Sequence, residues 1–226
     1  NAATFVCAMS SNPNGGSVTL VGKLKPRPLM RQVLVGRSGS KSGTGALVQL
    51  SGSTVTVGTG VGCGIVVDGR VLRGSFGGAG EIGHMPLGSD GPRCRCGVAG
   101  CAEPMASGSG LVARAQEAGL GVTTAREVFE SVDPRAALVI EHMVDHLARM
   151  LGAATALLNP DVIVVGGGVA QAGEALLAPL RVHCERYMLG SHRKALRILP
   201  AMLGEQAGVI GAGLSAWQAH GEGKGR

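Results

Sequence analysis

Gly80-Glu81-Ile82-Gly83-His84 is followed, ten positions after the histidine, by Cys94-Arg95-Cys96-Gly97-Val98-Ala99-Gly100-Cys101-Ala102-Glu103. His84, Cys94, Cys96 and Cys101 form the pattern His-x9-Cys-x-Cys-x4-Cys. Imidazole and thiolates are ligands that Zn²⁺ prefers, and four protein ligands leave no open position for a reactive water. We therefore predict a structural zinc ion that holds a Gly-rich loop together, with four reduced side chains in a metal-free loop as the alternative.

The same stretch resembles the signature of the ROK family (repressor, open reading frame, kinase). Members of this family are bacterial sugar kinases, such as glucokinase, or sugar-responsive repressors. The resemblance implies an α/β chain with the actin-like ATPase (ribonuclease H-like) fold, here mainly the C-terminal lobe with a structural zinc loop. It also implies that zinc is held by His84, Cys94, Cys96 and Cys101, and that sugar hydroxyls contact Glu81, His84 and Glu103.

The three side chains assigned to the sugar suit that role chemically. Carboxylates accept hydrogen bonds from neighbouring hydroxyls, and a site of hydrogen-bonding groups rejects analogues that lack the matching hydroxyl. An imidazole that gives one nitrogen to zinc has its orientation fixed, so its other nitrogen faces a sugar in one direction. For Glu103 the alternative is a carboxylate at the start of a helix, where the helix dipole stabilises it.

A hairpin pattern precedes the zinc motif. Residues 53–57 alternate small and apolar side chains as a strand, residues 58–64 predict a Gly-rich loop, and residues 65–67 resume a strand. Asp68-Gly69 predicts a tight turn into residues 70–72, because an Asp-Gly pair between apolar runs favours a two-residue hairpin connection.

Glycines in the loop over 58–64 let backbone N–H groups approach a phosphate closely. The resemblance implies that the outer phosphates of a nucleotide are held there by Gly58, Thr59 and Gly60. A plain Gly-rich turn is the alternative. The loop is not a Walker A sequence, because no Gly-Lys-Ser/Thr follows it.

Helices are predicted beyond the zinc motif. One covers residues 111–117, one begins at the capping box Thr124-x-x-Glu127, and a long one runs over 134–158. Apolar residues recur at helical spacing in the long helix, so we expect its core positions to be Leu138, Val144, Leu147, Leu151, Ala154 and Leu158.

A second glycine turn follows the long helix. Asn159-Pro160 ends the helix, residues 162–165 predict a buried parallel strand, and three glycines lead into a helix over 171–180. The third small residue of a Gly-x-Gly-x-x-Gly fingerprint is missing, which disfavours a dinucleotide dehydrogenase. The resemblance identifies this run as the adenosine motif, extends to a closing helix over 207–219, and implies cofactor contacts from Gly166, Gly167 and Gly168.

The composition is that of a globular domain with a packed core, since 45% of the 226 residues are hydrophobic. No window approaches the ~18 apolar residues of a membrane span, and no signal-peptide pattern opens the chain. Outside the metal set, Cys7, Cys63 and Cys184 are scattered singly, as in a reducing compartment. We therefore expect a cytoplasmic protein with no membrane partner.

The net charge of +6 comes from the start of the chain. Residues 1–50 contain Lys and Arg but no Asp or Glu, whereas the charges balance from Ser51 onward. No pair of amphipathic helices is evident there, which disfavours nucleic acid as a partner. We divide the chain into an atypical basic Gly/Ser/Pro-rich segment over 1–50 without family match, a ROK-type sugar kinase lobe with the zinc motif over 51–220, and a polar tail over 221–226.

Two parts of a family kinase are missing from the sequence. These are an Asp-x-Gly-Gly-Thr loop for the ATP phosphates and an Asn-Asp pair whose Asp takes the proton from the sugar hydroxyl. No other Asp is a convincing general base, so we identify no catalytic residue. We expect a truncated family member whose residues 1–50 are unrelated to the family, as if translated from a shifted reading frame.

The resemblance predicts an ATP-dependent hexose kinase that converts glucose to glucose 6-phosphate with ATP and Mg²⁺. Without the missing parts we expect weak or absent activity from this chain. The alternatives are a fragment of a sugar-sensing transcriptional repressor and a noncatalytic sugar-binding protein. The expected partners are a hexose, ATP and further copies of the chain, in a dimer or tetramer.

Overall fold

The computed structural model describes residues 3–8, 17–24, 33–38, 52–67, 70–89 and 91–203. The Asp68-Gly69 turn, the closing helix predicted over 207–219 and the tail over 221–226 lie outside these residues. No described helix combines the length and apolar content that a bilayer-spanning segment needs.

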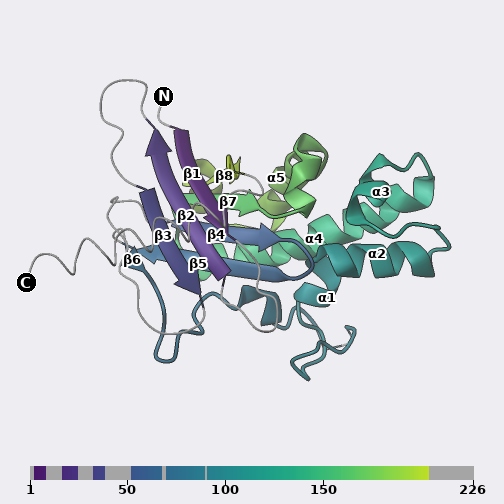
Figure 1. The fold of residues 1–226 in the computed structure, drawn as a ribbon, viewed down its shortest axis with the longest axis horizontal. Helices are drawn as coiled ribbons and strands as arrows, with labels where there is room; N and C mark the ends of the chain where they lie inside the picture. The colour runs from purple at the N-terminus through teal and green to yellow at the C-terminus, as the bar shows by residue number, and fades with distance from the viewer. Residues whose placement is uncertain are drawn as a thin grey trace, which may run out of the picture.

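A five-stranded mixed sheet forms the centre of the described lobe (Figure 1). Its spatial order is β6-β5-β4-β7-β8. The first three strands pair antiparallel, whereas β4, β7 and β8 run parallel. The bounds are β4 Gly52–Val57, β5 Val61–Val67, β6 Arg70–Val71, β7 Val162–Gly166 and β8 Arg197–Pro200.

The first hairpin is tighter than predicted. We expected a loop over 58–64, but β5 begins at Val61 and pairs with Val57, so only residues 58–60 connect the strands. Two of the glycines that suggested a longer loop, Gly62 and Gly64, are strand residues here and pair with Thr56 and Thr54 of β4. The pairing of β5 with β6 confirms the predicted hairpin over the two strands.

Helices cover one face of this sheet and build the sites beside it. The α-helices are α1 Glu103–Ala106, α2 Gly108–Glu117, α3 Ala125–Glu130, α4 Pro134–Leu158, α5 Glu174–Tyr187 and α6 Gly190–Ala195. Two 3-10 helices add η1 Ile82–His84 and η2 Val169–Ala172. The predicted long helix is confirmed at both ends, because Asp133 accepts from the Arg135 N–H at its start and Asn159 adopts a left-handed φ of 43° at its end.

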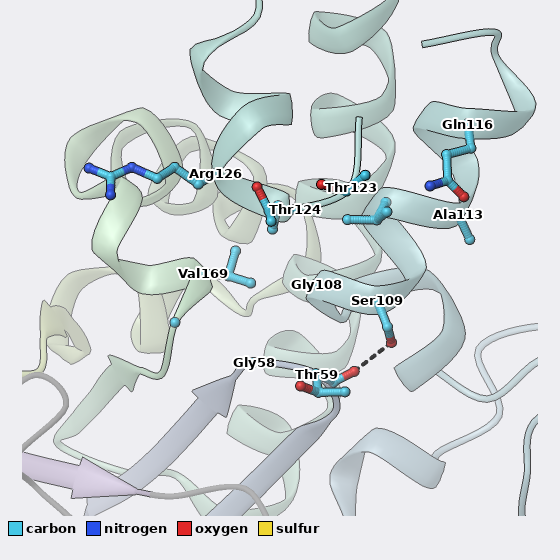
Figure 2. Close-up of a pocket in the computed structure, with 13 residues that line it drawn as sticks. Gly58, Thr59, Gly108, Ser109, Ala113, Gln116, Thr123, Thr124, Arg126 and Val169 are labelled. Carbon is cyan, nitrogen blue, oxygen red and sulfur yellow. Dashed lines mark hydrogen bonds between the residues drawn. The ribbon is translucent and has the colours of Figure 1, made fainter. Parts of the chain in front are cut away.

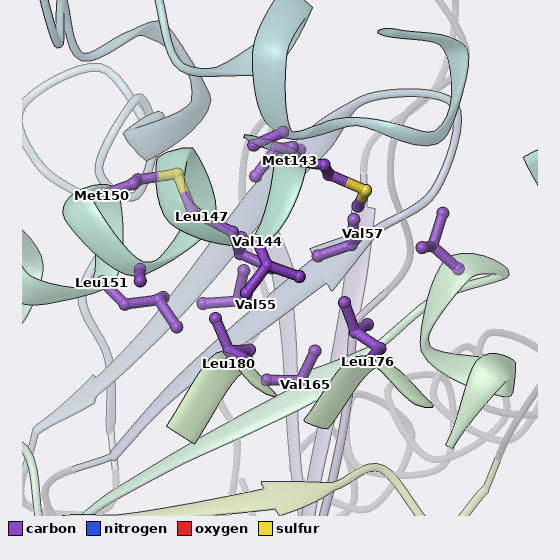
Figure 3. Close-up of a cluster of buried hydrophobic side chains, with 14 of the residues drawn as sticks. Val55, Val57, Met143, Val144, Leu147, Met150, Leu151, Val165, Leu176 and Leu180 are labelled. Atoms are coloured by element: carbon purple, nitrogen blue, oxygen red, sulfur yellow. The ribbon is translucent and has the colours of Figure 1, made fainter. Parts of the chain in front are cut away.

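The main core lies between the sheet and the helices α4 and α5 (Figure 3). Val55, Val57 and Val165 point from the strands toward Val144, Leu147 and Leu151 of α4 and Leu176 and Leu180 of α5. All of these side chains are buried, and Ala154 is buried with them. Removing one such leucine side chain from a packed core costs about 2–5 kcal/mol.

Leu138 contradicts the predicted core, because its side chain is 60% exposed. The buried stripe of α4 instead includes Ala136, Val139 and Met143 at its start. Leu138 shares the opposite face with Glu141, which is also exposed. The helix and the other predicted core positions are confirmed, with Leu158 partly buried against the core, and Leu138 alone lies outside the buried stripe.

Within the first fifty residues, the described backbone contains a three-stranded antiparallel sheet in the order β1-β2-β3. The strands are β1 Ala3–Ala8, β2 Ser17–Leu24 and β3 Val33–Ser38. β1 approaches β4 and β7 of the larger sheet (Figure 1). The sequence analysis had predicted no element for this segment.

Candidate functional site

The four predicted metal ligands come together, with His84 at the end of η1 and the three cysteines in the loop that precedes α1. One ligand atom from each of His84, Cys94, Cys96 and Cys101 lies within 4.8 Å of the others. Sγ of Cys96 is 3.6 Å from Sγ of Cys101, and Nδ1 of His84 is 3.4 Å from Sγ of Cys94. Two sulfurs bound tetrahedrally at 2.3 Å to one zinc lie about 3.8 Å apart. The spacing and the donor types therefore fit a single tetrahedral ion.

The thiols have unequal environments. Burial raises the pKa of Cys101 to about 12, with a further contribution from the neighbouring cysteines. Hydrogen bonding to the backbone of Val98 lowers the pKa of the exposed Cys96. Clustered thiols that resist deprotonation alone become thiolates when a divalent cation binds, so metal binding would release protons.

Backbone pairing and glycine geometry shape this loop. Pro86 pairs with Cys101 in an isolated antiparallel bridge, and Arg93 pairs with Ala99. Gly100 has a φ of +75°, and a Cβ there would collide with the carbonyl oxygen of Gly88. Glycine is therefore required at this position, which explains one of the residues interleaved with the ligands.

The His84 ring presents its two nitrogens to different neighbours. Nδ1 faces the thiols, whereas Nε2 lies 3.9 Å from Oε2 of Glu81. Both residues are positioned by glycines, because a Cβ on Gly80 would collide with the carbonyl oxygen of Cys63 and a Cβ on Gly83 would lie 2.5 Å from the carbonyl oxygen of Val61. The η1 turn can thus pack directly on the strand. One nitrogen therefore faces the three cysteines and the other faces the Glu81 carboxylate.

Glu103 is the first residue of α1 and is partly buried. Its Oε2 accepts a hydrogen bond of 3.0 Å from the backbone N–H of Val61. The backbone N–H of Ala102 in turn donates to the carbonyl of Met85, so the Glu103 segment lies directly beside the η1 turn. The structure therefore brings the segments of all three predicted sugar-binding residues together at the start of β5.

A cavity of about 530 Å³ opens beside Gly58 and Thr59, in the connection between β4 and β5 (Figure 2). It lies where the parallel strands β4 and β7 end side by side, the usual position of a ligand in an α/β sheet. The lining residues come from the two loops after these strands, from α2 and from the start of α3, and are Gly58, Thr59, Gly108, Ser109, Val112, Ala113, Gln116, Thr123, Thr124, Ala125, Arg126, Gly168 and Val169.

The six residues predicted to bind the cofactor divide into two groups. Gly58, Thr59 and Gly168 line the cavity. The other three are not among its lining residues, and they are Gly60, Gly166 and Gly167. Gly167 has a φ of +92°, and a Cβ there would collide with the carbonyl oxygen of Val57. This glycine permits the two strand ends to approach.

The sequence analysis missed the contribution of α2. This helix begins at Gly108, three residues before the predicted start, and Ser107 caps it by accepting from the Gly110 N–H. Ser109 Oγ donates to the carbonyl of Thr59 at 2.5 Å (Figure 2). A Ser that precedes a Gly-rich turn was the available signal for this cap.

The predicted start of the helix over 171–180 is wrong. The glycine turn leads first into η2, and α5 starts only at Glu174 and continues to Tyr187. Gly173 has a φ of +61° and separates η2 from α5.

The start of α3 resembles the predicted capping box. The Oγ1 of Thr124 accepts from the N–H of Glu127, as expected, and the Glu127 carboxylate accepts from the N–H of Thr123, one residue before the cap.

Comparison with known proteins identifies the family. A model of the ROK family matches residues 49–219. The chain belongs to the ROK family. It is 42% identical over 178 residues to a glucokinase of Halalkalibacterium halodurans, covering 70% of this chain and 54% of that protein. It is 38% identical over 120 residues to an N-acetylmannosamine kinase of Vibrio cholerae, covering 52% and 42%. The chain thus spans about half the length of the curated relatives it matches.

Solved ROK structures share the fold. A ROK hexokinase from Thermus thermophilus matches with a TM-score of 0.69 and 35% identity, covering 79% of this chain and 61% of that one. A ROK glucokinase from Streptomyces griseus, in complex with glucose and AMPPNP, matches with 0.68 and 31%, covering 78% and 63%. A ROK transcriptional regulator, a homolog of the E. coli MLC protein, matches with 0.66 and 29%, covering 76% and 46%. The mixed α/β sheet is therefore that of the actin-like ATPase fold.

Proposed function

We propose that this ROK chain carries the sugar-binding and nucleotide-binding half-sites of an ATP-dependent hexose kinase, with glucose as the hexose. The observation that carries the proposal is the β4–β5 hairpin. At Val61 it contacts Glu103 on the sugar side, and at Thr59 it contacts Ser109 on the nucleotide side. Two substrates bound at these places would lie on one rigid element, as phosphoryl transfer requires.

Zinc holds the sugar side in this proposal. His84, Cys94, Cys96 and Cys101 would fill the coordination shell of the ion, so the metal is structural. With Nδ1 of His84 bound to zinc, the imidazole plane would be fixed and Nε2 could donate to or accept from a sugar hydroxyl beside Glu81. The carboxylates of Glu81 and Glu103 accept from further hydroxyls, which favours a sugar over an apolar ligand.

The cavity between α2 and the glycine loops would hold ATP. The Gly58 and Gly108 N–H groups are paired with backbone carbonyls, so the N–H of Thr59 and the N-terminus of α2 at Ser109 would serve the phosphates, and Gly168 would lie by the nucleoside. Mg²⁺ bound to the phosphates would neutralise the charge that develops during transfer. The chain has no Asn-Asp general base or Asp-x-Gly-Gly-Thr loop. We therefore expect weak or absent turnover, reduced about 10²–10⁴-fold by the missing base alone.

ATP turnover with and without glucose tests the proposal. The sample is the purified chain with its zinc content measured at one per chain, and Glu81→Gln is the matched control. Weak or absent ADP release together with measurable binding of both substrates supports two half-sites without a base. Rapid glucose-dependent ADP release that Glu81→Gln abolishes would show a working kinase and overturn the expected loss. A zinc-loaded chain that binds neither substrate would overturn the half-sites themselves.

A sugar-sensing repressor fragment is the second candidate, favoured by the match to a ROK transcriptional regulator. Such a protein would bind sugar without needing ATP, so a nucleotide that binds the cavity argues against it. A noncatalytic sugar-binding protein would behave in the same way. For either kinase or sensor we propose a cytoplasmic homo-oligomer, a dimer or tetramer, and its mass in solution tests this.

A further inference from the structure

The nucleotide cavity has a polar side chain at the end away from the glycine loop. Ser109, Val112, Ala113 and Gln116 recur at spacings of three and four residues, so they share the face of α2 that lines the cavity. Helix α2 rises about 10 Å from Ser109 to Gln116, which separates a phosphate end from a distal end. Figure 2 shows Gln116 at the distal end, beyond Ala113.

A backbone carbonyl orients the Gln116 amide. Nε2 donates a hydrogen bond of 2.8 Å to the carbonyl oxygen of Val122. Because a carbonyl oxygen only accepts, the nitrogen of the amide must face Val122 and Oε1 must lie on the other side. In Figure 2 this oxygen lies on the side of Ala113. Oε1 and the second N–H of the amide remain to pair with a ligand.

The other polar side chains at this end support the start of α3. Oγ1 of Thr124 accepts from the N–H of Glu127 at 3.2 Å, and Oγ1 of Thr123 donates to the Glu127 carboxylate at 3.2 Å. Arg126 donates through Nε to the carboxylate four residues later, at 2.8 Å. The amide on α2 is therefore the group best placed to recognise a base.

We propose that Gln116 selects adenine as the base of the bound nucleotide, an inference that rests on the nucleotide site of the proposed function. Adenine presents its exocyclic amine, a donor, beside a ring acceptor, and a glutamine amide pairs with both. Guanine and hypoxanthine carry an oxygen at that position, so Oε1 would face a second acceptor and neither would be paired. Val112 and Ala113 provide apolar surface beside the ring.

Calorimetric titration of the full chain with ADP and with IDP, both with Mg²⁺, tests this assignment. The two nucleotides differ in the purine at position 6, where IDP has an oxygen in place of the amine. We expect ADP to bind on the order of ten- to a hundred-fold more tightly than IDP. Gln116→Leu removes both hydrogen-bonding groups of the amide at similar side-chain volume. ADP should then bind more weakly, so that the ratio of ADP affinity to IDP affinity falls to near one. Gln116→Ala, which adds no apolar surface, should give the same ratio.

Ser109→Ala is the matched control, because it alters the phosphate end of the same helix face. It should weaken ADP and IDP by the same factor and keep their ratio. An ADP:IDP ratio that is unchanged in both Gln116 variants overturns the base assignment while the proposed function stands. A zinc-loaded wild-type chain that binds neither nucleotide overturns the nucleotide site, and the assignment with it.

Discussion

The proposed metal and sugar region and the proposed nucleotide cavity both contact the β4–β5 hairpin, but they are encoded differently. The metal and sugar region is contained in residues 80–103, so the spacing of one short stretch brings its side chains together. The cavity takes its lining from residues 58–59, 108–126 and 168–169, which only the folded sheet makes neighbours. The sequence alone can indicate a site whose residues lie close together in the chain. Of a site assembled from distant segments, the sequence indicated only the glycine turns.

Loss of a metal ligand should have the largest effect, because it removes the interaction that closes the local site. In Cys101→Ser we expect loss of zinc and a fall in the free energy of unfolding on the order of 5 kcal/mol. Metal analysis and thermal unfolding with and without a chelator measure both. Cys184→Ala, a buried cysteine of the core, is the control and should retain its zinc. An unchanged unfolding temperature in Cys101→Ser, with or without chelator, would contradict a structural metal.

Gly167→Ala should damage the assembled site and spare the local one. The new Cβ would strain a φ of +92° and collide with Val57, so we expect a loss of about 1–3 kcal/mol in stability. ADP binding should weaken, while the zinc content stays at one per chain. Gly168→Ala is the control, because a Cβ there meets nothing within 4 Å. Equal destabilisation by both variants would show that the close approach at Val57 is unimportant.

Glu103→Gln should separate sugar binding from the fold. The amide oxygen of Gln can still accept from the Val61 N–H, so the unfolding temperature should hardly change. Loss of a charged hydrogen-bond acceptor to a sugar hydroxyl should weaken glucose binding about ten- to a hundred-fold. Titration calorimetry measures the glucose affinity, and Glu117→Gln, on the exposed side of α2, is the control. If the glucose affinity does not change, Glu103 does not bind the sugar and is only a carboxylate at the start of a helix.

Asp145 should have the smallest effect, because it lies in the α4–α5 contact and touches neither site. Burial raises its pKa, but hydrogen bonds from Tyr187, Arg149 and His183 outweigh burial and lower the pKa to about 2. The carboxylate therefore stabilises the fold above its unfolded pKa of about 4, and this stabilisation is lost as the pH falls from 4 to 2.

We expect Asp145→Asn to lose about 1 kcal/mol near neutral pH, allowing for solvent screening, and to lack that acid dependence. Chemical unfolding at pH 7, 4 and 3 measures the effect. Asp161→Asn, at an exposed position, is the control. A variant whose stability falls from pH 4 to 3 as steeply as that of the wild type would refute the role of this carboxylate.

The sequence predicted those parts of the fold that depend on local pattern. The limits of α4 were correct because Asp133-Pro134 and Asn159-Pro160 mark them directly. The metal cluster was predicted because its ligands lie within eighteen positions. Strand β8 and the short helix α6 were missed because short elements give little periodic signal, and α1 was anticipated only as the alternative role of Glu103 at a helix start.

The remaining errors arise from tertiary contacts. Gly62 and Gly64 indicated a loop, yet they are strand residues because β5 pairs with β4 from Val61 onward. Leu138 was expected in the core with the other apolar residues of α4, but its side chain lies outside the stripe that packs on the sheet. The role of Gln116 depends on a carbonyl in the next loop, so no spacing in the sequence could indicate it.

Equilibrium binding of labelled glucose and of ADP to the same zinc-loaded chain, in wild type and Glu81→Gln, tests the two half-sites most directly. The account predicts saturable binding of both ligands to the wild type, and loss of glucose binding with retained ADP binding in Glu81→Gln. Failure of the zinc-loaded wild type to bind glucose, or loss of both ligands in the variant, would contradict two separate half-sites on one hairpin.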